Sequence, residues 1–157
     1  MDANQSLVSE WLAQAGKVAG HVLSLGEDGH CTLNFGDGMG CMVEVADGSE
    51  LVFIYVPLIH LPEDVRQQAM LLKFVLELNL FGLQTGGAVL AYDERTDFIL
   101  LTFSARLELL DAEIFGRALG DVLDVAVMLN TKIIDFEQSL MGQTSSNIGM
   151  DISAIKA

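Results

Sequence analysis

Apolar residues within positions 4–15 recur every three or four residues, which is the spacing of one face of a helix. The members of this face are Leu7, Val8, Trp11, Leu12 and Ala15. Asn4 or Ser6 is suited to cap the first turn, and Gly16 is suited to end the helix. We therefore expect a short amphipathic helix over residues 4–15.

From His21 to Leu58 the pattern changes to short apolar runs separated by Asp-Gly pairs. The pairs are Asp28-Gly29, Asp37-Gly38 and Asp47-Gly48, and Asp-Gly between apolar runs is a strong hairpin signal. The runs are Val22–Leu25, which is short, and then Cys31–Phe35, Cys41–Val45 and Leu51–Val56. The three longer runs predict an antiparallel meander, and Val22–Leu25 is a candidate for one further strand.

The turns set the expected pairing within this meander. If Gly38 centres the first turn, Cys31 lies opposite Val45, and if Asp47-Gly48 forms the second, Val43 lies opposite Val52. One face is then apolar and should face the core: Leu33, Phe35, Val43, Val45, Val52, Ile54 and Val56. The opposite face is half apolar: Thr32, Asn34, Met42, Glu44, Leu51, Phe53 and Tyr55. A solvated face should be polar, so another element or a bound peptide is expected to cover it.

The middle of the chain predicts a helix that is apolar on most sides. Pro57 and Pro62 interrupt the strand pattern, and Leu61-Pro62-Glu63-Asp64 opens a helix that runs to about Leu80. Its polar stripe is narrow: Arg66, Gln67, Lys73 and Glu77. A helix of this kind must be buried on two sides, and we expect the second cover to be another subunit.

The remaining elements complete an α+β fold. After the glycine-rich loop Gly82–Gly87 come two strands, Ala88–Tyr92 and Phe98–Ser104, and then a long helix from about Asp111 to Leu140. The expected fold is an antiparallel twisted sheet of about five to six strands with three helices, in the order α-βββ-α-ββ-α. Residues 1–140 form one domain, and residues 141–157 are expected to form a flexible C-terminal tail.

Composition and charge narrow the classes of partner. Hydrophobic residues make up 51% of the chain, which favours a buried partner interface. Eight Lys and Arg stand against 22 Asp and Glu, a net charge of −14, which disfavours nucleic acid and anionic membranes. The sequence has no run of about 18 apolar residues, the length that a membrane-spanning helix needs, and no signal-peptide pattern. We therefore expect no membrane insertion. With only two cysteines, the chain is expected to be cytoplasmic with reduced thiols.

Candidate metal ligands and nucleophiles match no catalytic pattern. His21, His30, Cys31 and Cys41 lack the paired spacing of a zinc site, and the cysteines are better interpreted as small buried hydrophobes. His60 has no serine or cysteine at a recognisable nucleophile turn.

The acidic and glycine-rich loops give no better candidates. Asp93, Glu94 and Asp97 fit a solvated turn, and Gln84–Gly87 lacks the Gly-Lys-Ser/Thr ending of a phosphate loop. We therefore expect a protein that is not an enzyme and needs no cofactor and no metal.

Four stretches in this order resemble the Tir/SycE-like (CesT-type) family of type III secretion chaperones. They are Gly29–Phe35, Leu61–Asp64, Glu77–Gly82 running into Thr85–Ala88, and Asp111–Glu113. The resemblance covers about residues 4–138.

The resemblance implies a bacterial cytoplasmic homodimer that binds the N-terminal segment of a secreted effector and keeps it extended, without ATP. It implies a dimer interface through the middle helix, carried here by Val65, Ala69, Leu72, Phe74 and Leu76. It also implies effector binding through the first helix and the sheet, partly by strand addition at an edge. The implied effector-binding residues are Leu7, Val8, Trp11, Asn34, Met42, Leu51 and Phe53. Components of the secretion apparatus are further candidate partners.

Two alternatives remain open from the sequence. The same fold could serve as a non-enzymatic scaffold or regulatory module that binds a folded protein, because fold alone does not determine function. Trp11 could be a core residue instead of an interface anchor.

Overall fold

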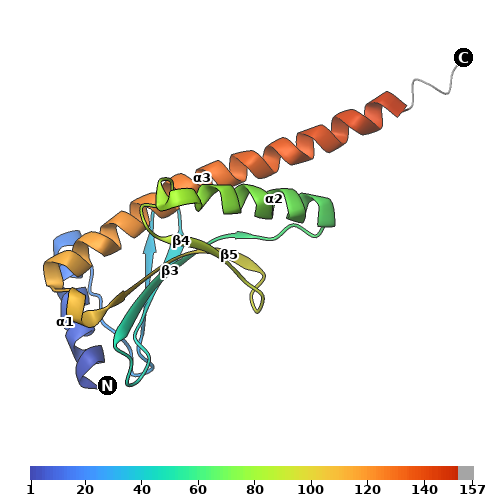
Figure 1. Cartoon of the computed structure of the whole chain (residues 1–157). Helices are drawn as coiled ribbons and strands as arrows, with labels where there is room; N and C mark the ends of the chain where they lie inside the picture. Colours follow the sequence, from blue (N-terminus) through green and yellow to red (C-terminus); the bar gives the residue numbers. More distant parts are fainter. Residues whose placement is uncertain (152–157) are drawn as a thin grey trace, which may run out of the picture.

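The computed structural model describes the backbone of residues 1–151 and the side-chain surroundings of residues 1–142. The helices are α1 (Ala3–Ala19), α2 (Val65–Leu78) and α3 (Ala112–Asp151). The strands are β1 (His30–Phe35), β2 (Met39–Glu44), β3 (Leu51–His60), β4 (Val89–Asp93) and β5 (Phe98–Arg106). The predicted α+β class and the order α-βββ-α-ββ-α are confirmed (Figure 1).

The five strands form one antiparallel sheet in the order β1-β2-β3-β5-β4. The helices gather on one face of this sheet, where α3 crosses it and α2 lies alongside α3 (Figure 1). Side chains from all three helices and from the inward positions of the strands share one hydrophobic core. The face that is predicted to be buried, including Val43, Val52 and Ile54, does face this core.

Both hairpins of the meander pair two residues away from the predicted register. Cys31 lies opposite Val43 and Val43 lies opposite Ile54, where the sequence analysis placed Val45 and Val52. The first turn is a tight three-residue loop, because Gly36 and Gly38 both adopt positive φ, and the second turn includes Ser49. A shift of two residues preserves which face each side chain occupies, so the predicted faces are correct although the pairs are wrong.

Pro57 does not end its strand as predicted. β3 continues to His60, and its pairing with β5 is irregular between Pro57 and Ile59. β2 pairs with β3 only as far as Tyr55, so the side of β3 that Pro57 would present to β2 is unpaired there. A proline is tolerated at such a position because no ladder hydrogen bond is lost.

The first helix is longer at both ends than predicted. Asp2 caps it, and the Asp2 carboxylate accepts from the Gln5 N–H at 2.8 Å while the Gln5 side chain accepts from the Asp2 N–H. Gly20, in the left-handed conformation, ends it. Gly16 serves packing instead: a Cβ there would lie 2.6 Å from the His21 carbonyl oxygen.

The segment Val22–Leu25 is not a strand. It crosses from α1 to β1 as an irregular connection, and the Leu25 N–H donates to the Ser9 hydroxyl at 3.2 Å. Within residues 1–151 the sheet therefore has five strands.

The last helix extends beyond its predicted end at Leu140. α3 has 40 residues and continues to Asp151, and its far end projects past the rest of the molecule (Figure 1). The first part of the predicted C-terminal tail is therefore helical, while residues 152–157 lie outside the described residues. Ile133 and Leu140 are buried and Phe136 stacks on Phe74 of α2, so this part of α3 packs as a regular amphipathic helix.

Candidate functional site

The outer face of the sheet, opposite the helices, carries large apolar side chains. Leu51 and Phe53 are each 37% exposed, and Met42 and Tyr55 are half-buried beside them. The face predicted to be half apolar is thus uncovered within the described residues. A surface of this kind in one contiguous area is suited to bind another polypeptide.

Part of this face is hollowed into a cavity of about 620 Å³, which we call the outer hollow. Its lining comes from β2, β3, β5, the last residue of β4 and the turn that follows it: Met42, Glu44, Phe53, Ile54, Tyr55, Pro57, Asp93, Arg95, Thr96, Phe98, Leu100 and Thr102. Met42 and Phe53 had been predicted from the sequence. Pro57, Phe98 and Leu100 had not been predicted. The alternation of Phe98, Leu100 and Thr102 along one strand does indicate that these three side chains share a face of the sheet.

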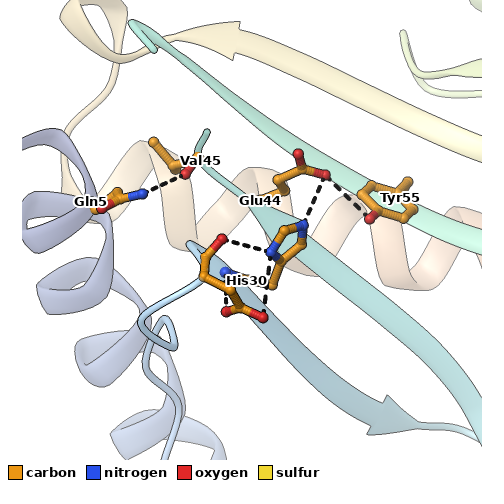
Figure 2. A network of polar contacts seen from close by, with 6 residues as sticks. Gln5, His30, Glu44, Val45 and Tyr55 are labelled. Carbon is orange, nitrogen blue, oxygen red and sulfur yellow. Dashed lines mark hydrogen bonds and ion pairs between the residues drawn. The ribbon is translucent and has the colours of Figure 1, made fainter. Parts of the chain in front are cut away.

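A polar network borders the outer hollow (Figure 2). The Tyr55 hydroxyl donates to Glu44 Oε2 at 3.3 Å, and His30 Nε2 lies 3.4 Å from the same oxygen. Partial burial, followed by the nearby Glu44 charge, raises the pKa of Tyr55, so the hydroxyl stays a hydrogen-bond donor. His30 Nδ1 lies 2.8 Å from the Asp28 carbonyl oxygen, which orients the ring. The arrangement can bind polar groups of a partner, and it contains no nucleophile.

The turn at the other border of the outer hollow is held by its own side chains. The Asp93 carboxylate accepts from the Arg95 N–H at 3.0 Å and from the Thr96 hydroxyl at 2.9 Å. These hydrogen bonds hold the pKa of Asp93 below its ordinary value. Of the three acids predicted to lie in a solvated turn, Glu94 is exposed, whereas Asp93 and Asp97 are half-buried.

The predicted effector-binding residues divide into two groups. Leu7, Asn34, Leu51 and Phe53 are exposed and Met42 is half-buried, so all five are accessible at the surface. Val8 and Trp11 are buried at 0% and 6% exposure, and the Trp11 ring lies 5.7 Å from the Phe115 ring. The structure places Trp11 in the core, which corrects its assignment and that of Val8 as contact residues.

The middle helix α2 is not enclosed by its own protomer. Leu71, Val75 and Leu78 face the core, whereas Val65 and Leu76 are 75% and 68% exposed. At 100° per residue, the predicted residues Val65, Ala69, Leu72 and Leu76 form one stripe, which we call the α2 stripe. Ala69 is exposed and Leu72 is half-buried.

Phe74 does not belong to the α2 stripe. Its ring stacks on Phe136 of α3 with centroids 4.2 Å apart, so α3 of the same protomer covers this flank of the helix. The family resemblance implied an interface role for Phe74, and its contact with Phe136 was not predicted from the sequence.

The loop after α2 exposes three further apolar side chains: Leu80, Phe81 and Leu83. Phe81 adopts a φ of 58°, which is uncommon for a residue with a bulky side chain. The same loop holds the start of β4, because the Asn79 side chain pairs with the main chain of Leu90. The sequence analysis noted this segment for its glycines and as one of the stretches that carry the family resemblance, but it did not predict that these apolar side chains are exposed.

Both cysteines are buried on the inward face of the sheet, as small hydrophobes would be. Burial raises the pKa of the Cys31 thiol and raises that of Cys41 to about 12. Neither thiol is therefore a ready nucleophile or ligand. None of the helices in the part of the chain that the structure describes is long and apolar enough to cross a membrane.

These features define a class of protein. An α+β domain whose helices cover one face of an antiparallel sheet, and which exposes an apolar sheet face and an apolar helix stripe, is built to bind other chains. The comparisons agree, because the Tir chaperone protein (CesT) family matches residues 10–130. The chain belongs to this family, and it is a chaperone of type III secretion and not an enzyme.

Solved structures show the same fold. The structure of the ExsC–ExsE complex matches with a TM-score of 0.66 and 22% identity, over 83% of this chain and 96% of that chain. The HopA1–SchA chaperone–effector complex matches with a TM-score of 0.63 and 17% identity, over 83% and 98%. The ExoU–SpcU complex from the type III secretion system of Pseudomonas aeruginosa matches with a TM-score of 0.60 and 18% identity, over 82% and 95%. No match is found among the curated proteins.

Proposed function

We propose that this protein is a homodimeric chaperone in the bacterial cytoplasm that binds the N-terminal segment of a type III secreted effector. It keeps that segment extended and competent for secretion. The observation that carries the proposal is the uncovered apolar outer face of the sheet, with its hollow of about 620 Å³. Removing the Leu51 and Phe53 side chains from water lowers the free energy, so binding of a partner chain over this face is favourable.

The matched structures support a secreted protein as that partner. SchA was solved with the effector HopA1, SpcU with ExoU, and ExsC with ExsE. Burial of apolar side chains and main-chain hydrogen bonds supply the binding energy for an extended segment, so no ATP is needed.

The α2 stripe supports the homodimer. Two copies of an amphipathic stripe related by a twofold axis bury the same residues on both sides, which is the commonest way for a protein to self-associate. Because Phe136 covers the Phe74 flank, the stripe with Val65 and Leu76 is the part of α2 left for a second copy.

A pull-down from the native host tests the proposal. We expect the protein to retain secreted proteins through N-terminal fragments that are unstructured on their own, as mass spectrometry and circular dichroism of the fragments would show. Phe53→Glu should reduce this capture at least tenfold, because it places a charge on the outer face. Leu109→Glu, a matched change at an exposed leucine outside both surfaces, should not.

Two outcomes would contradict the proposal. Capture only of folded proteins would instead support a scaffold or regulatory module of the same fold. Equal capture by the wild type and Phe53→Glu would show that the outer face does not bind the client.

A further inference from the structure

The two ends of the outer hollow differ in charge. Its lining includes three charged side chains: Glu44, Asp93 and Arg95. At the turn end, Arg95 Nε lies 3.5 Å from Asp93 Oδ1, so these two charges offset each other. At the other end, Glu44 has no Lys or Arg within ion-pair distance among the described residues. The outer hollow therefore keeps one carboxylate without a permanent cation, and we call the part around Glu44 its acidic end.

The hydrogen bonds of Glu44 use only one of its two oxygens. Oε2 accepts from the Tyr55 hydroxyl at 3.3 Å, and His30 Nε2 lies 3.4 Å from the same atom (Figure 2). Within the described part of the chain no polar group pairs with Oε1. The Glu44 side chain is 32% exposed, so less water screens its charge than at a fully exposed position. Oε1 is thus available to accept from a cation that enters the outer hollow.

Aromatic rings stand beside this carboxylate. Glu44 lies directly opposite Phe53 in the pairing of β2 with β3, and residues opposite each other on one face have Cβ atoms about 4.5–5.5 Å apart. The hydrogen bond from Tyr55 brings a second ring to the same place. The face of an aromatic ring attracts a cation. The acidic end therefore combines a free acceptor oxygen with ring surfaces.

We propose that the acidic end of the outer hollow selects an arginine side chain of the bound client segment. The inference rests on the proposed function and names the residue that the outer face recognises. The guanidinium donates to Glu44 Oε1 and lies against the Phe53 ring, while its aliphatic stem follows the apolar lining. Arginine suits this site better than lysine, because a planar guanidinium stacks on aromatic rings and is more weakly hydrated than an ammonium.

The rest of the outer hollow sets the residues next to that arginine. Its volume of about 620 Å³ exceeds that of one side chain, so neighbouring client residues enter as well. Beyond Tyr55 the lining is apolar at Pro57, Phe98 and Leu100, which favours apolar neighbours. Arg95 at the turn end repels a second cation there. The selected pattern is therefore one arginine beside apolar residues, not a run of basic residues.

An NMR titration with synthetic peptides tests this selection. The probe is the peptide Thr-Leu-Arg-Leu-Thr with blocked ends, and its partner carries citrulline, which has nearly the shape of arginine without the charge. We expect the arginine peptide to shift the amide signals of Leu100 and Thr102, and the citrulline peptide to bind at least fivefold more weakly. A peptide with lysine should also bind more weakly than the arginine peptide. These comparisons use the wild-type protein alone, so they do not depend on any variant folding.

Two matched variants locate the selection. Glu44→Gln keeps the shape of the side chain and an acceptor for Tyr55 but removes the charge, so it should bring the arginine and citrulline peptides to within twofold of each other. Glu10→Gln removes one carboxylate from an exposed position on α1, on the other side of the sheet, and should keep the full preference.

Several outcomes would overturn the arginine site. They are equal binding of the arginine and citrulline peptides, equal binding of the lysine peptide, no binding of any peptide, or a preference that persists in Glu44→Gln. Loss of the preference in Glu10→Gln would also overturn it, because the effect would then come from net charge.

Failure of this site is distinguishable from failure of the proposed function. Capture of secreted segments that depends on Phe53, without any preference for arginine, would retain the chaperone and remove the arginine site alone. A preference for arginine that depends on Glu44, in a protein that captures no secreted segment, would retain the site and refute the chaperone.

Discussion

Leu7 and Val8 are neighbours on α1, yet they lie in opposite environments. Val8 is fully buried in the core, whereas Leu7 lies at the surface. Trp11 follows Val8 on the same side of the helix and contacts Phe115 of α3. The structure therefore separates residues that share an apolar pattern into those that hold the fold and those free to bind.

Trp11 and Leu7 should consequently respond differently to truncation. We expect Trp11→Ala to lower the free energy of unfolding by about 3–5 kcal/mol, because it removes a large buried side chain. Leu7→Ala should change it by less than about 0.5 kcal/mol, which is typical of surface positions. Urea unfolding followed by circular dichroism measures both. Similar losses in the two variants would contradict the assignment of Trp11 to the core.

Cys41 should make stability depend on pH in the alkaline range. The unfolded chain releases the thiol proton near its ordinary pKa, about 8.5, whereas burial raises the folded pKa to about 12. Above pH 9 the unfolded state thus binds fewer protons, and the free energy of unfolding falls as pH rises towards 12. The slope from this group is at most about 1.4 kcal/mol per pH unit.

The variant Cys41→Val isolates this contribution. Its free energy of unfolding, measured in urea from pH 8 to 11, should fall less steeply than that of the wild type. The two curves should converge or cross as pH rises, and parallel curves would show that the buried thiol titrates normally.

At the scale of elements, α2 is covered on some of its sides and exposed on another. Its inward residues pack on the sheet, its Phe74 flank is covered by α3, and the α2 stripe remains open. A helix with this division packs against the rest of the chain on two sides and leaves the α2 stripe exposed for the second copy proposed above.

Charges on the α2 stripe should prevent the dimer without unfolding the protomer. Val65→Asp and Leu76→Asp should each shift the protein from dimer to monomer at micromolar concentration, because each would bury two unpaired carboxylates across the twofold axis. Light scattering coupled to size exclusion measures the mass, and Leu109→Asp is the control. A wild-type protein that is already monomeric would count against the homodimer.

Local patterns predicted the elements better than their ends and pairings. The Asp-Gly pairs located the turns, but the register depended on positive φ at both Gly36 and Gly38, which an Asp-Gly pair does not specify. Gly16 is a residue type that commonly ends a helix, yet it lies inside α1. A glycine is needed there because the His21 carbonyl oxygen approaches closely, a contact that the local sequence pattern does not reveal.

The candidate site was partly predictable for the same reason. Met42, Leu51 and Phe53 follow from alternation along the meander, and Val65 and Leu76 follow from helical spacing. Phe98 and Leu100 required knowledge that β5 lies next to β3. Contacts between segments far apart in sequence were the part that pattern could not supply.

For the whole molecule, high negative charge and exposed apolar surface act against each other. The net charge of −14 keeps copies apart at neutral pH, while the outer hollow and the α2 stripe favour association. The relative size of this charge repulsion and of the apolar attraction determines the pH and salt range in which the protein does not aggregate.

Acidification should therefore drive non-specific association. As pH falls from 7 towards the isoelectric point of about 4.2, carboxylates gain protons and the repulsion disappears, so static light scattering should rise sharply. Phe53→Glu should delay this rise, because it reduces the apolar surface. Scattering that stays flat through pH 4.2 would mean that the apolar surfaces are covered in solution.

The cap of the first helix has a practical consequence. Asp2 Oδ2 also accepts from the Gly48 N–H at 2.7 Å, and Asn4 donates to the Ser49 carbonyl oxygen, so the first turn of α1 clamps the β2–β3 turn. That turn leads directly into Leu51 and Phe53. An affinity tag fused to Met1 would therefore lie next to the outer face of the sheet. In a pull-down, such a tag would compete with the client for that surface.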